Sequence, residues 1–523
     1  MLIRSFILAS LVCSLAFAQA GAEIARRPVT LMDSLRSTLE KHPGIQLQEQ
    51  QVILNEGALR VASGQFDTSL NASISQNHTN TPLTVAQQFQ YAQLGLITSN
   101  LAANTTTYTV GAQKLFRNGI TIGPTMTLNR NTDNLATRLG YNEAQLSFQV
   151  LLPFLRGRGR AAVDAQELSS ESVVNASLHD TNQTVAQLLA TTAISYWNAV
   201  AAVQNLQIAV GSEKRGEKYV RDVQTLIDAD KVPKGEIYQL LANLDGRTAS
   251  RIAAEQAVIS SQQSLALAMG LKSNEVMISP DASDPLPDWS EKAIPEVSPR
   301  IVQKFVNNAM NRRPDLIAAK LRVQSAEQIL PAARNQLRPQ LNLTLNTGYT
   351  GFLEGTGFGR PFGAAFNNVQ GLNTYASLNF AFPPRNDVAI GQLAQADASY
   401  RQSILNETEL KRNIASNVVT AITTLSNSIA ALQKAREAVA YYRIALDQEQ
   451  ERFRLGLNSL VDVLTMEDRL TSALSGAVSA QQNYAVAIEN LRLATGTIVD
   501  PNQRTHTIEK DTFIRPPFES ELQ

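Results

Sequence analysis

The chain has 523 residues, and its 46 Lys and Arg residues are balanced by 46 Asp and Glu residues. Because the formal net charge is zero, there is no global positive field to hold nucleic acid, and a nucleic-acid-binding protein is disfavoured. Hydrophobic residues make up 44% and charged residues 18%, against about 25% charged in ordinary soluble domains. This composition excludes both a disordered chain and a bundle of membrane helices.

Residues 1–22 have the pattern of a secretory signal peptide. Arg4 precedes an apolar run from Phe6 to Phe17, and small residues follow at Ala18, Ala20 and Ala22. An apolar run of this length is too short to span a bilayer, which requires about 20 residues. We therefore expect an exported protein.

The single cysteine, Cys13, lies inside that apolar run and follows Val12, where a lipoprotein cleavage box needs a small residue. We therefore expect a mature chain without a thiol and without a lipid anchor. No later segment has eighteen uninterrupted apolar residues. Entry into a membrane would then require a closed β-barrel, because only helices and barrels satisfy every backbone group in lipid.

Short helices are predicted after the leader. An amphipathic helix over Thr30–Lys41 is followed by a second helix over Pro43–Gly64, and the same pair recurs at Pro299–Asn311 and Pro314–Gln336. Proline at the first helical position is tolerated because its missing N–H would be unpaired there anyway.

Alternation of apolar and polar residues predicts strands with one apolar and one polar face. A soluble sandwich shows the same alternation, so the strands alone leave both a barrel and a sandwich open. The predicted strands are Ser69–Ser75, Tyr108–Leu115, Ile120–Leu128, Leu146–Leu152, Gln340–Tyr349 and Thr374–Phe382.

Two very long helices are predicted over residues 163–228 and 387–454, which contain no proline. At 1.5 Å per residue each would be about 100 Å long, too long to wrap a compact core. The helix that follows the second one repeats apolar residues by threes and fours from Leu460 to Leu491, which is typical of a coiled coil. Glu467 and Gln481 lie on the same stripe and indicate a wide, partly hydrated assembly.

The chain also resembles itself. Leu31–Asn71 aligns without gaps with Val302–Asn342, and Glu236–Gly270 aligns with Asp462–Gly496. We therefore expect one duplicated unit. Its parts are a signal peptide at 1–22, a first repeat at 23–271, a linker at 272–297, a second repeat at 298–496 and a C-terminal tail at 497–523.

Amphipathic strands and helical hairpins of this length must share one exported molecule. Each copy has too few strands to close a barrel alone, because transmembrane barrels need at least eight. Several chains must therefore close it together. Strands that leave such a barrel and continue as helices form a tube, which indicates a conduit.

The turn sequence from Arg452 to Leu464 resembles the helix-turn-helix signature of the TolC-type outer-membrane efflux proteins. The same resemblance is carried by Leu152–Arg160, His42–Pro43, Arg313–Pro314, Met269–Gly270 and Thr495–Gly496.

This resemblance implies an α+β membrane protein that forms a homotrimer. Four strands per chain would build a 12-stranded outer-membrane β-barrel, and a long α-helical coiled-coil tunnel would continue it into the periplasm. The implied partners are outer-membrane lipid, a periplasmic adaptor (membrane fusion) protein and an inner-membrane transporter. An additional alternating stretch, Tyr108–Arg130, would give six strands if it entered the bilayer, but we expect four, with this hairpin rising beyond the membrane.

The candidate site is the periplasmic aperture at the hairpin ends. An acid follows each turn, Glu236 in the first copy and Asp462 in the second, and three-fold symmetry would turn each into a ring that favours cations. The alternative is that an acid in the first turn only complements the helix dipole. By the resemblance, Asp462 matches an aperture acid, whereas Thr465 replaces a second acid and Asn458 replaces a basic residue that latches the hairpins.

The turns themselves are predicted to dock the adaptor, although solvated turns would look the same. They comprise Leu455, Gly456, Leu457, Asn458 and Ser459 in the second hairpin and Val232, Pro233, Lys234 and Gly235 in the first.

No catalytic or metal site is predicted, since the four histidines are scattered and no phosphate-binding glycine loop opens a helix. We therefore expect no enzyme and no cofactor. The leading hypothesis is a passive outer-membrane channel of a tripartite efflux system. A conduit for secreted polypeptides of the type I kind and a periplasmic coiled-coil scaffold are the alternatives.

Overall fold

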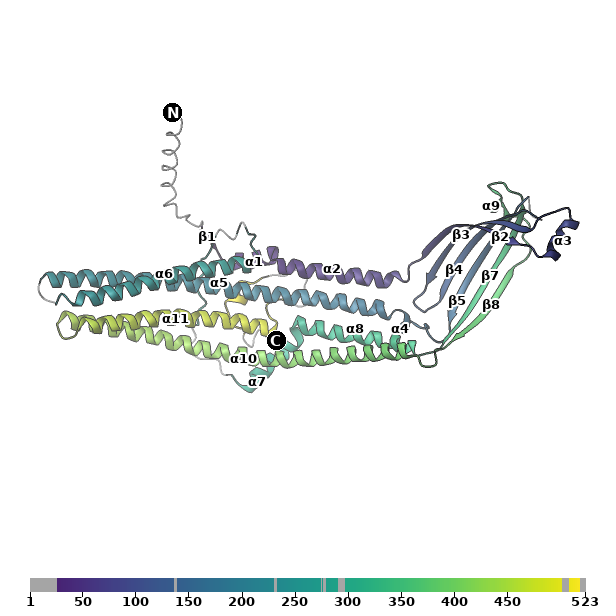
Figure 1. Ribbon diagram of the computed structural model, residues 1–523. Coiled ribbons are helices and arrows are strands. Elements are labelled where there is room, and N and C mark those ends of the chain that lie inside the picture. Colours follow the sequence, from purple (N-terminus) through teal and green to yellow (C-terminus); the bar gives the residue numbers. More distant parts are fainter. Residues whose placement is uncertain are drawn as a thin grey trace, which may run out of the picture. The chain divides into compact units, whose positions relative to one another are not determined.

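The computed structural model describes residues 26–135, 139–229, 233–273, 275, 279–289, 297–500 and 508–517 (Figure 1). The predicted signal peptide lies outside these residues. The chain divides into two compact units, each built from pieces of both halves of the sequence. One unit comprises residues 1–51, 178–318 and 408–523, and the other comprises 52–177 and 319–407.

The helices follow the predicted boundaries closely. The two long helices contain 64 and 68 residues and are confirmed. Absence of proline and of turn residues allows a helix to continue over this length. The helices are α1 (Leu31–Lys41), α2 (Pro43–Gly64), α3 (Val85–Gln93), α4 (Arg160–Val163), α5 (Ala165–Asp228), α6 (Glu236–Ala268), α7 (Pro299–Arg312), α8 (Pro314–Gln336), α9 (Arg360–Ala364), α10 (Asp387–Arg454), α11 (Leu460–Thr495) and the 3₁₀ helix η1 (Lys510–Phe513).

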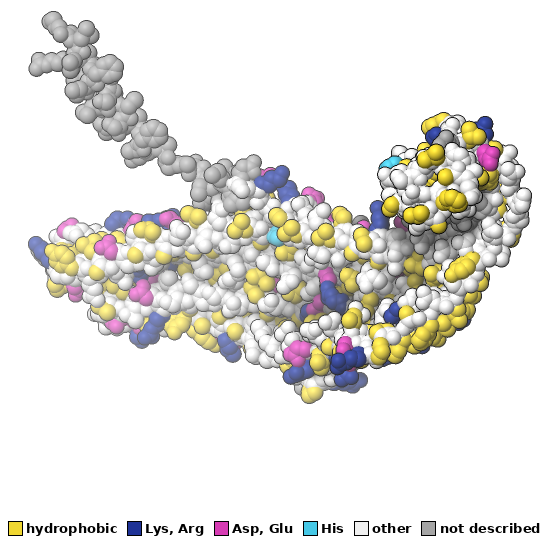
Figure 2. Space-filling view, turned by 45° about the vertical axis from the view of Figure 1, so that its right-hand side comes forward, with side chains coloured by type: hydrophobic (Ala, Val, Ile, Leu, Met, Phe, Trp, Pro, Cys, Tyr) yellow, Lys and Arg dark blue, Asp and Glu magenta, His cyan; other side chains and the backbone are white. Residues whose placement is uncertain are grey.

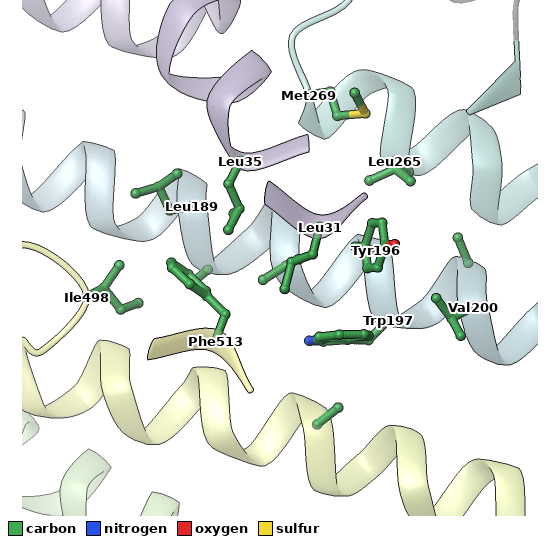
Figure 3. Packing of buried hydrophobic residues seen from close by; sticks show 14 of the residues in the cluster. Leu31, Leu35, Leu189, Tyr196, Trp197, Val200, Leu265, Met269, Ile498 and Phe513 are labelled. Atoms are coloured by element: carbon green, nitrogen blue, oxygen red, sulfur yellow. The ribbon is translucent and has the colours of Figure 1, made fainter. Parts of the chain in front are cut away.

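The core of the first unit has two main parts. In one part, Leu31 and Leu35 of α1 pack with Trp197 of α5, Leu265 of α6 and Phe513 of η1, as Figure 3 shows. These five side chains are almost fully buried. Burial of side chains of this size contributes about 1.5–3 kcal/mol each, so this cluster fixes α1 and the C-terminal segment on the α5–α6 hairpin.

The second part of this core involves equivalent elements of the second half of the chain. Phe305 and Ala309 of α7 pack against Ile414 and Ile429 of α10 and against Ile488 of α11. The helix pairs α1–α2 and α7–α8 thus lie on the base of the hairpins α5–α6 and α10–α11, respectively.

The linker and the tail are also attached to this unit. Strand β6 (Ser279–Ala282) pairs in parallel with β1 (Arg26–Val29). Just after β6, Asp284 accepts hydrogen bonds from the Leu31 N–H at 2.7 Å, the Tyr196 hydroxyl at 3.1 Å and the Lys510 ammonium at 2.9 Å. One carboxylate therefore joins the start of α1, the middle of α5 and the C-terminal segment.

The second unit contains a single antiparallel sheet in the order β2-β3-β4-β5-β7-β8. It has six strands, because β3 and β4 are hydrogen-bonded within the sheet, β3 to β2 and β4 to β5. The expectation that four strands of each chain enter the barrel stays a prediction. The strands are β2 (Ser69–Pro82), β3 (Asn100–Leu115), β4 (Thr121–Asp133), β5 (Tyr141–Pro153), β7 (Gln340–Glu354) and β8 (Asn373–Ala381).

The turn between β3 and β4 lies at the end of the sheet where the strands join the helices. Gly119 in this turn has φ +96°, and a Cβ there would lie 2.0 Å from the Gly157 carbonyl oxygen, so only glycine fits. Arg117 stacks over the Phe66 ring at 4.6 Å and donates two hydrogen bonds to the Glu167 carboxylate at 2.6 and 2.7 Å. The hairpin therefore spans the sheet from its loop end to its helix end.

Candidate functional site

The turn of the second hairpin is closed by backbone geometry. After α10 ends at Arg454, Gly456 adopts φ +74° and its N–H donates to the Phe453 carbonyl at 3.0 Å. The Leu457 N–H donates to the Arg452 carbonyl at 2.9 Å. This is a glycine-terminated helix end, and it leaves Leu455 and Leu457 exposed at the tip.

Asp462 has a capping role in this turn. Its N–H is bound by the Ser459 hydroxyl oxygen at 3.3 Å, and its carboxylate accepts from the Ser459 hydroxyl at 2.6 Å and from the Ser459 N–H at 3.1 Å. These hydrogen bonds to the charged form lower the pKa of Asp462. The carboxylate is therefore ionised at neutral pH and is in a capping box.

Glu236 occupies the corresponding place in the first hairpin with different contacts. It begins α6 after Gly235, and that helix start has no side-chain cap. The Glu236 N–H donates to the Pro233 carbonyl at 3.2 Å. Lys234 and Gly235 complete the described part of this turn, whereas Val232 lies outside the described residues.

The other two predicted aperture residues bind groups of their own hairpin. The Thr465 hydroxyl donates to the Val461 carbonyl at 2.8 Å, one turn earlier in α11. The Asn458 amide donates to the Glu449 carboxylate, which ties the turn back to α10. Both side chains therefore stabilise the local hairpin.

A polar network that the sequence analysis did not identify joins the two hairpins above these turns. Glu467 of α11 is fully buried and accepts a hydrogen bond from Arg215 of α5. Arg247 of α6 lies 3.7 Å from the same carboxylate and binds Asp468 at 2.8 Å. The Arg247 guanidinium also donates to the Ser212 carbonyl at 3.1 Å.

Burial of these charged groups costs desolvation free energy, which the contacts between them must offset. Two guanidinium groups from the first hairpin surround one buried carboxylate from the second, so removal of the carboxylate would leave buried positive charge. The neighbouring Tyr219 hydroxyl accepts from the Gln450 amide at 2.8 Å, and burial raises the pKa of Tyr219. The signal in the sequence was Glu467 itself, an acid at a stripe position where a coiled coil normally has an apolar residue.

The sheet has one polar and one apolar face. Residues paired directly across strands point to the same face. One such row crosses all six strands and contains only small or polar residues: Asn71, Gly111, Thr125, Ser147, Gly348 and Asn373. The next row, on the opposite face, contains Ala72, Val110, Met126, Leu146 and Tyr349.

Two properties of the described residues concern metal binding and membrane-spanning helices. Among the described residues, no group of three or more His, Cys, Asp or Glu side chains is arranged to hold a metal ion. Within the same part of the chain, no helix is both long enough and apolar enough to cross a membrane.

The fold is that of known outer-membrane channels. The Campylobacter jejuni CmeC outer membrane channel superimposes with a TM-score of 0.65 at 14% identity, over 90% of this chain and 87% of that one. At this identity the likeness shows the fold, an α+β arrangement of long helices and a sheet.

Sequence comparison finds a family match in the second half of the chain. Residues 305–497 match the outer membrane efflux protein family. The outer membrane protein TolC of Salmonella enteritidis is 23% identical over 203 residues, which are 38% of this chain and 40% of that protein. TolC of Vibrio cholerae is 21% identical over 313 residues, 60% of this chain and 68% of that protein.

Proposed function

We propose that this protein is the outer-membrane channel of a tripartite export system. In this proposal three chains form a homotrimer whose sheets close a β-barrel in outer-membrane lipid and whose helical hairpins form a periplasmic tunnel. The observation that carries the proposal is the combination of two long helical hairpins with a sheet that has one apolar and one polar face. The match of residues 305–497 to the outer membrane efflux protein family supports it, and the leader pattern at residues 1–22 supports export.

The proposed conduction is passive and requires partners. A periplasmic adaptor would dock at the hairpin tips, where exposed Leu455 and Leu457 offer apolar side chains. An inner-membrane transporter would supply both the substrate and the energy. The two halves of the chain would have arisen by duplication, which the equivalent helix pairs on the bases of the two hairpins support.

The proposed aperture lies at the hairpin tips. There, rings of Asp462 and Glu236 carboxylates in the trimer would favour cations. The buried network of Glu467 with Arg215 and Arg247 would resist separation of the two hairpins, which widening of the tunnel end requires. The capping role of Asp462 is compatible with this proposal, because a capping carboxylate remains ionised.

Current measurements in planar bilayers test the proposal. We expect the purified trimer to conduct with a preference for cations, and the double variant Asp462→Asn, Glu236→Gln to lower the cation-to-anion permeability ratio about twofold or more. Asp468→Asn, which neutralises a half-exposed acid one turn further along α11, is the matched control and should change the ratio less.

The possible outcomes separate the hypotheses. Absence of any current, together with release of the protein from membranes without detergent, would favour the periplasmic scaffold and overturn the channel. Conduction with an unchanged permeability ratio in the double variant would reject the acidic rings and leave the channel intact.

A further inference from the structure

We propose that β3 and β4 are part of the barrel wall, so that each chain contributes six strands and the trimer closes an eighteen-stranded barrel. The inference deepens the proposed function and rests on it. It differs from the twelve strands that the family resemblance implies, and it follows from the register of this sheet.

The first argument is that β3 and β4 have the same two faces as the other strands. On the apolar side, Val110 of β3 pairs with Met126 of β4, which pairs with Leu146 of β5. On the opposite side, Thr109 pairs with Thr127 in the same two strands. The hairpin therefore keeps its alternation in phase with β5.

The second argument is the height of the apolar surface. In β4 the apolar face runs from Ile122 to Met126 and Leu128 and ends at Arg130. The six residue steps from Ile122 to Leu128, at about 3.4 Å each, extend about 20 Å, or about 16 Å of height at a strand tilt of about 40°. This is about two thirds of the apolar band of about 25 Å that outer-membrane barrels present to lipid.

The third argument is the absence of charge from this surface. On the apolar face of β3, no Lys, Arg, Asp or Glu lies between Lys114, near the helix end, and the level of Arg130, near the loop end. Val110 lies between those levels with 59% of its surface exposed. An exposed, uncharged face bounded by charged residues is complementary to hydrocarbon between two head-group layers. In Figure 2 hydrophobic side chains gather along the sheet at the right of the view, and charged side chains are sparse there.

At the loop end, α9 covers the apolar face. Ala364 packs on Leu128 and Ala144, which are buried, at a point where Gly351 leaves no room for a Cβ. Phe362 and Arg360 of this segment are exposed. Aromatic residues at this level are typical of the girdle at a membrane interface.

The fourth argument is the opposite face, which would line the lumen. There a hollow of about 260 Å³ lies over β2 to β5, as expected for the concave side of the sheet. Cross-strand hydrogen bonds join Thr105 to Asn131 and Thr107 to Asn129, both at 2.8 Å. The lumen surface of the inserted hairpin is thus polar, with the acid Asp133 at its loop end.

The edges of the sheet are the surfaces that would meet the neighbouring chains. β2 and β8 are the outer strands of the sheet, and each is paired on one side only. Closure of three such sheets would pair each β2 with the β8 of an adjacent subunit and leave no open edge in lipid. Because barrel diameter grows about linearly with strand number, eighteen strands give a lumen about one and a half times as wide as twelve. A polar lumen of that width suits large polar solutes.

The experiment compares the two faces of each strand in the full-length protein in outer-membrane vesicles, with Cys13→Ser as background. Single cysteines are labelled with a membrane-impermeant maleimide and, separately, with a nitroxide whose collisions with oxygen and with a water-soluble nickel chelate are measured. The apolar-face variants are Val110→Cys and Ile122→Cys, the polar-face variants are Thr109→Cys and Thr121→Cys, and the matched controls in β5 are Val150→Cys and Gln149→Cys.

We expect maleimide to react about tenfold or more slowly at Val110→Cys and Ile122→Cys than at their polar-face neighbours, because hydrocarbon suppresses the thiolate. Nitroxides at these two positions should collide with oxygen more than with the nickel chelate. A nitroxide buried in protein would collide little with either oxygen or the nickel chelate. Low collision rates with both reagents at Val110→Cys and Ile122→Cys would therefore contradict the proposal.

The β5 controls separate this inference from the proposed function. Equal reactivity of the two faces in β3 and β4, with alternation retained at Val150→Cys and Gln149→Cys, would place the hairpin outside the membrane and overturn the eighteen-stranded barrel. Loss of alternation in β5 as well would overturn the barrel altogether, and with it the proposed channel.

Discussion

The two helical hairpins occupy equivalent places in the two halves of the chain but are stabilised differently. The α10–α11 turn ends one helix with Gly456 and begins the next with the Ser459–Asp462 capping box. The α5–α6 turn begins its second helix at Gly235 without a side-chain cap. Local sequence therefore fixes the second turn more tightly than the first.

The hairpins also differ in what they bury. By the alignment of the two halves, the buried acids Glu467 and Glu489 of α11 correspond to Leu241 and Gln263 of α6. The second hairpin thus carries ionisable groups in positions where the first is neutral. Two helices that align in sequence can therefore differ in the polar contacts that they make.

The largest expected effect on the free energy of unfolding comes from Glu467→Leu. This variant gives α11 the residue type of the aligned position in α6, Leu241. Loss of the carboxylate leaves Arg215 and Arg247 without their shared partner, and we expect a loss of about 3 kcal/mol in the free energy of unfolding. Urea unfolding of the detergent-solubilised protein, followed by circular dichroism, measures it. Asp468→Asn is the matched control, with an expected cost below about 1 kcal/mol because Asp468 is 52% exposed. Equal costs for the two variants would show that burial of the network is unimportant.

The next largest effect is a pH dependence of stability that is due to Glu489. This residue accepts a hydrogen bond from the Trp197 indole N–H at 3.4 Å. Burial raises the pKa of Glu489 well above its ordinary value of 4.5, which favours its neutral form in the folded protein. Its contribution to stability is complete below pH 4.5 and is lost as the pH rises through the folded-state pKa, by at most about 1.4 kcal/mol per pH unit.

Glu489→Gln again introduces the residue of the first hairpin and removes this titration. We expect the variant and the parent to unfold at similar urea concentrations below pH 4.5, and the variant to become the more stable of the two as the pH rises. Glu451→Gln, at a mostly exposed position of α10, should show no such divergence. A constant difference between variant and parent at every pH would contradict the assignment.

The smallest effect concerns the two turns. Gly456→Ala places a Cβ on a backbone with φ +74° and should cost about 1 kcal/mol, although nothing lies within 4 Å of that Cβ. Gly235→Ala is at φ −67° and should leave stability unchanged or raise it by about 0.5 kcal/mol. Urea unfolding of both variants measures the difference, and a comparable loss in both would show that the turns are equally constrained.

The helices could be predicted from the sequence to within a few residues because their boundaries have local causes. Pro43 and Pro314 begin their helices as predicted, and Asp387–Arg454 was predicted with the observed bounds. Proline at a first turn, and its absence elsewhere, are signals that need no knowledge of tertiary contacts.

The sheet was less predictable. The segment Asn77–Asn104 reads as a polar connection, yet β2 continues to Pro82 and β3 begins at Asn100. The end of β2 is polar on both faces, and the start of β3 has three consecutive apolar residues, Leu101 to Ala103, so neither shows alternation. The place of β3 and β4 inside the sheet depends on pairing with β2 and β5, which short-range patterns do not specify.

The candidate site was predictable only in part. Asp462 in the first turn of a helix, after Ser459, has the sequence of a capping box, and the structure contains that box. Glu467 was recognisable as an acid on an apolar stripe. Its partners Arg215 and Arg247 were not, because they lie more than 200 residues away and meet it only through the packing of one hairpin on the other.

The connectivity of the sheet has a consequence for how the protein folds. Strands β2 to β5 follow one another in the chain and pair as neighbours, whereas β5 and β7 join residues such as Pro153 and Asn342, with a complete helical hairpin between them. Contacts between distant residues form slowly because a long loop must first be closed. We therefore expect the four-stranded meander to form early and the β5–β7 junction to be the last step that completes each subunit.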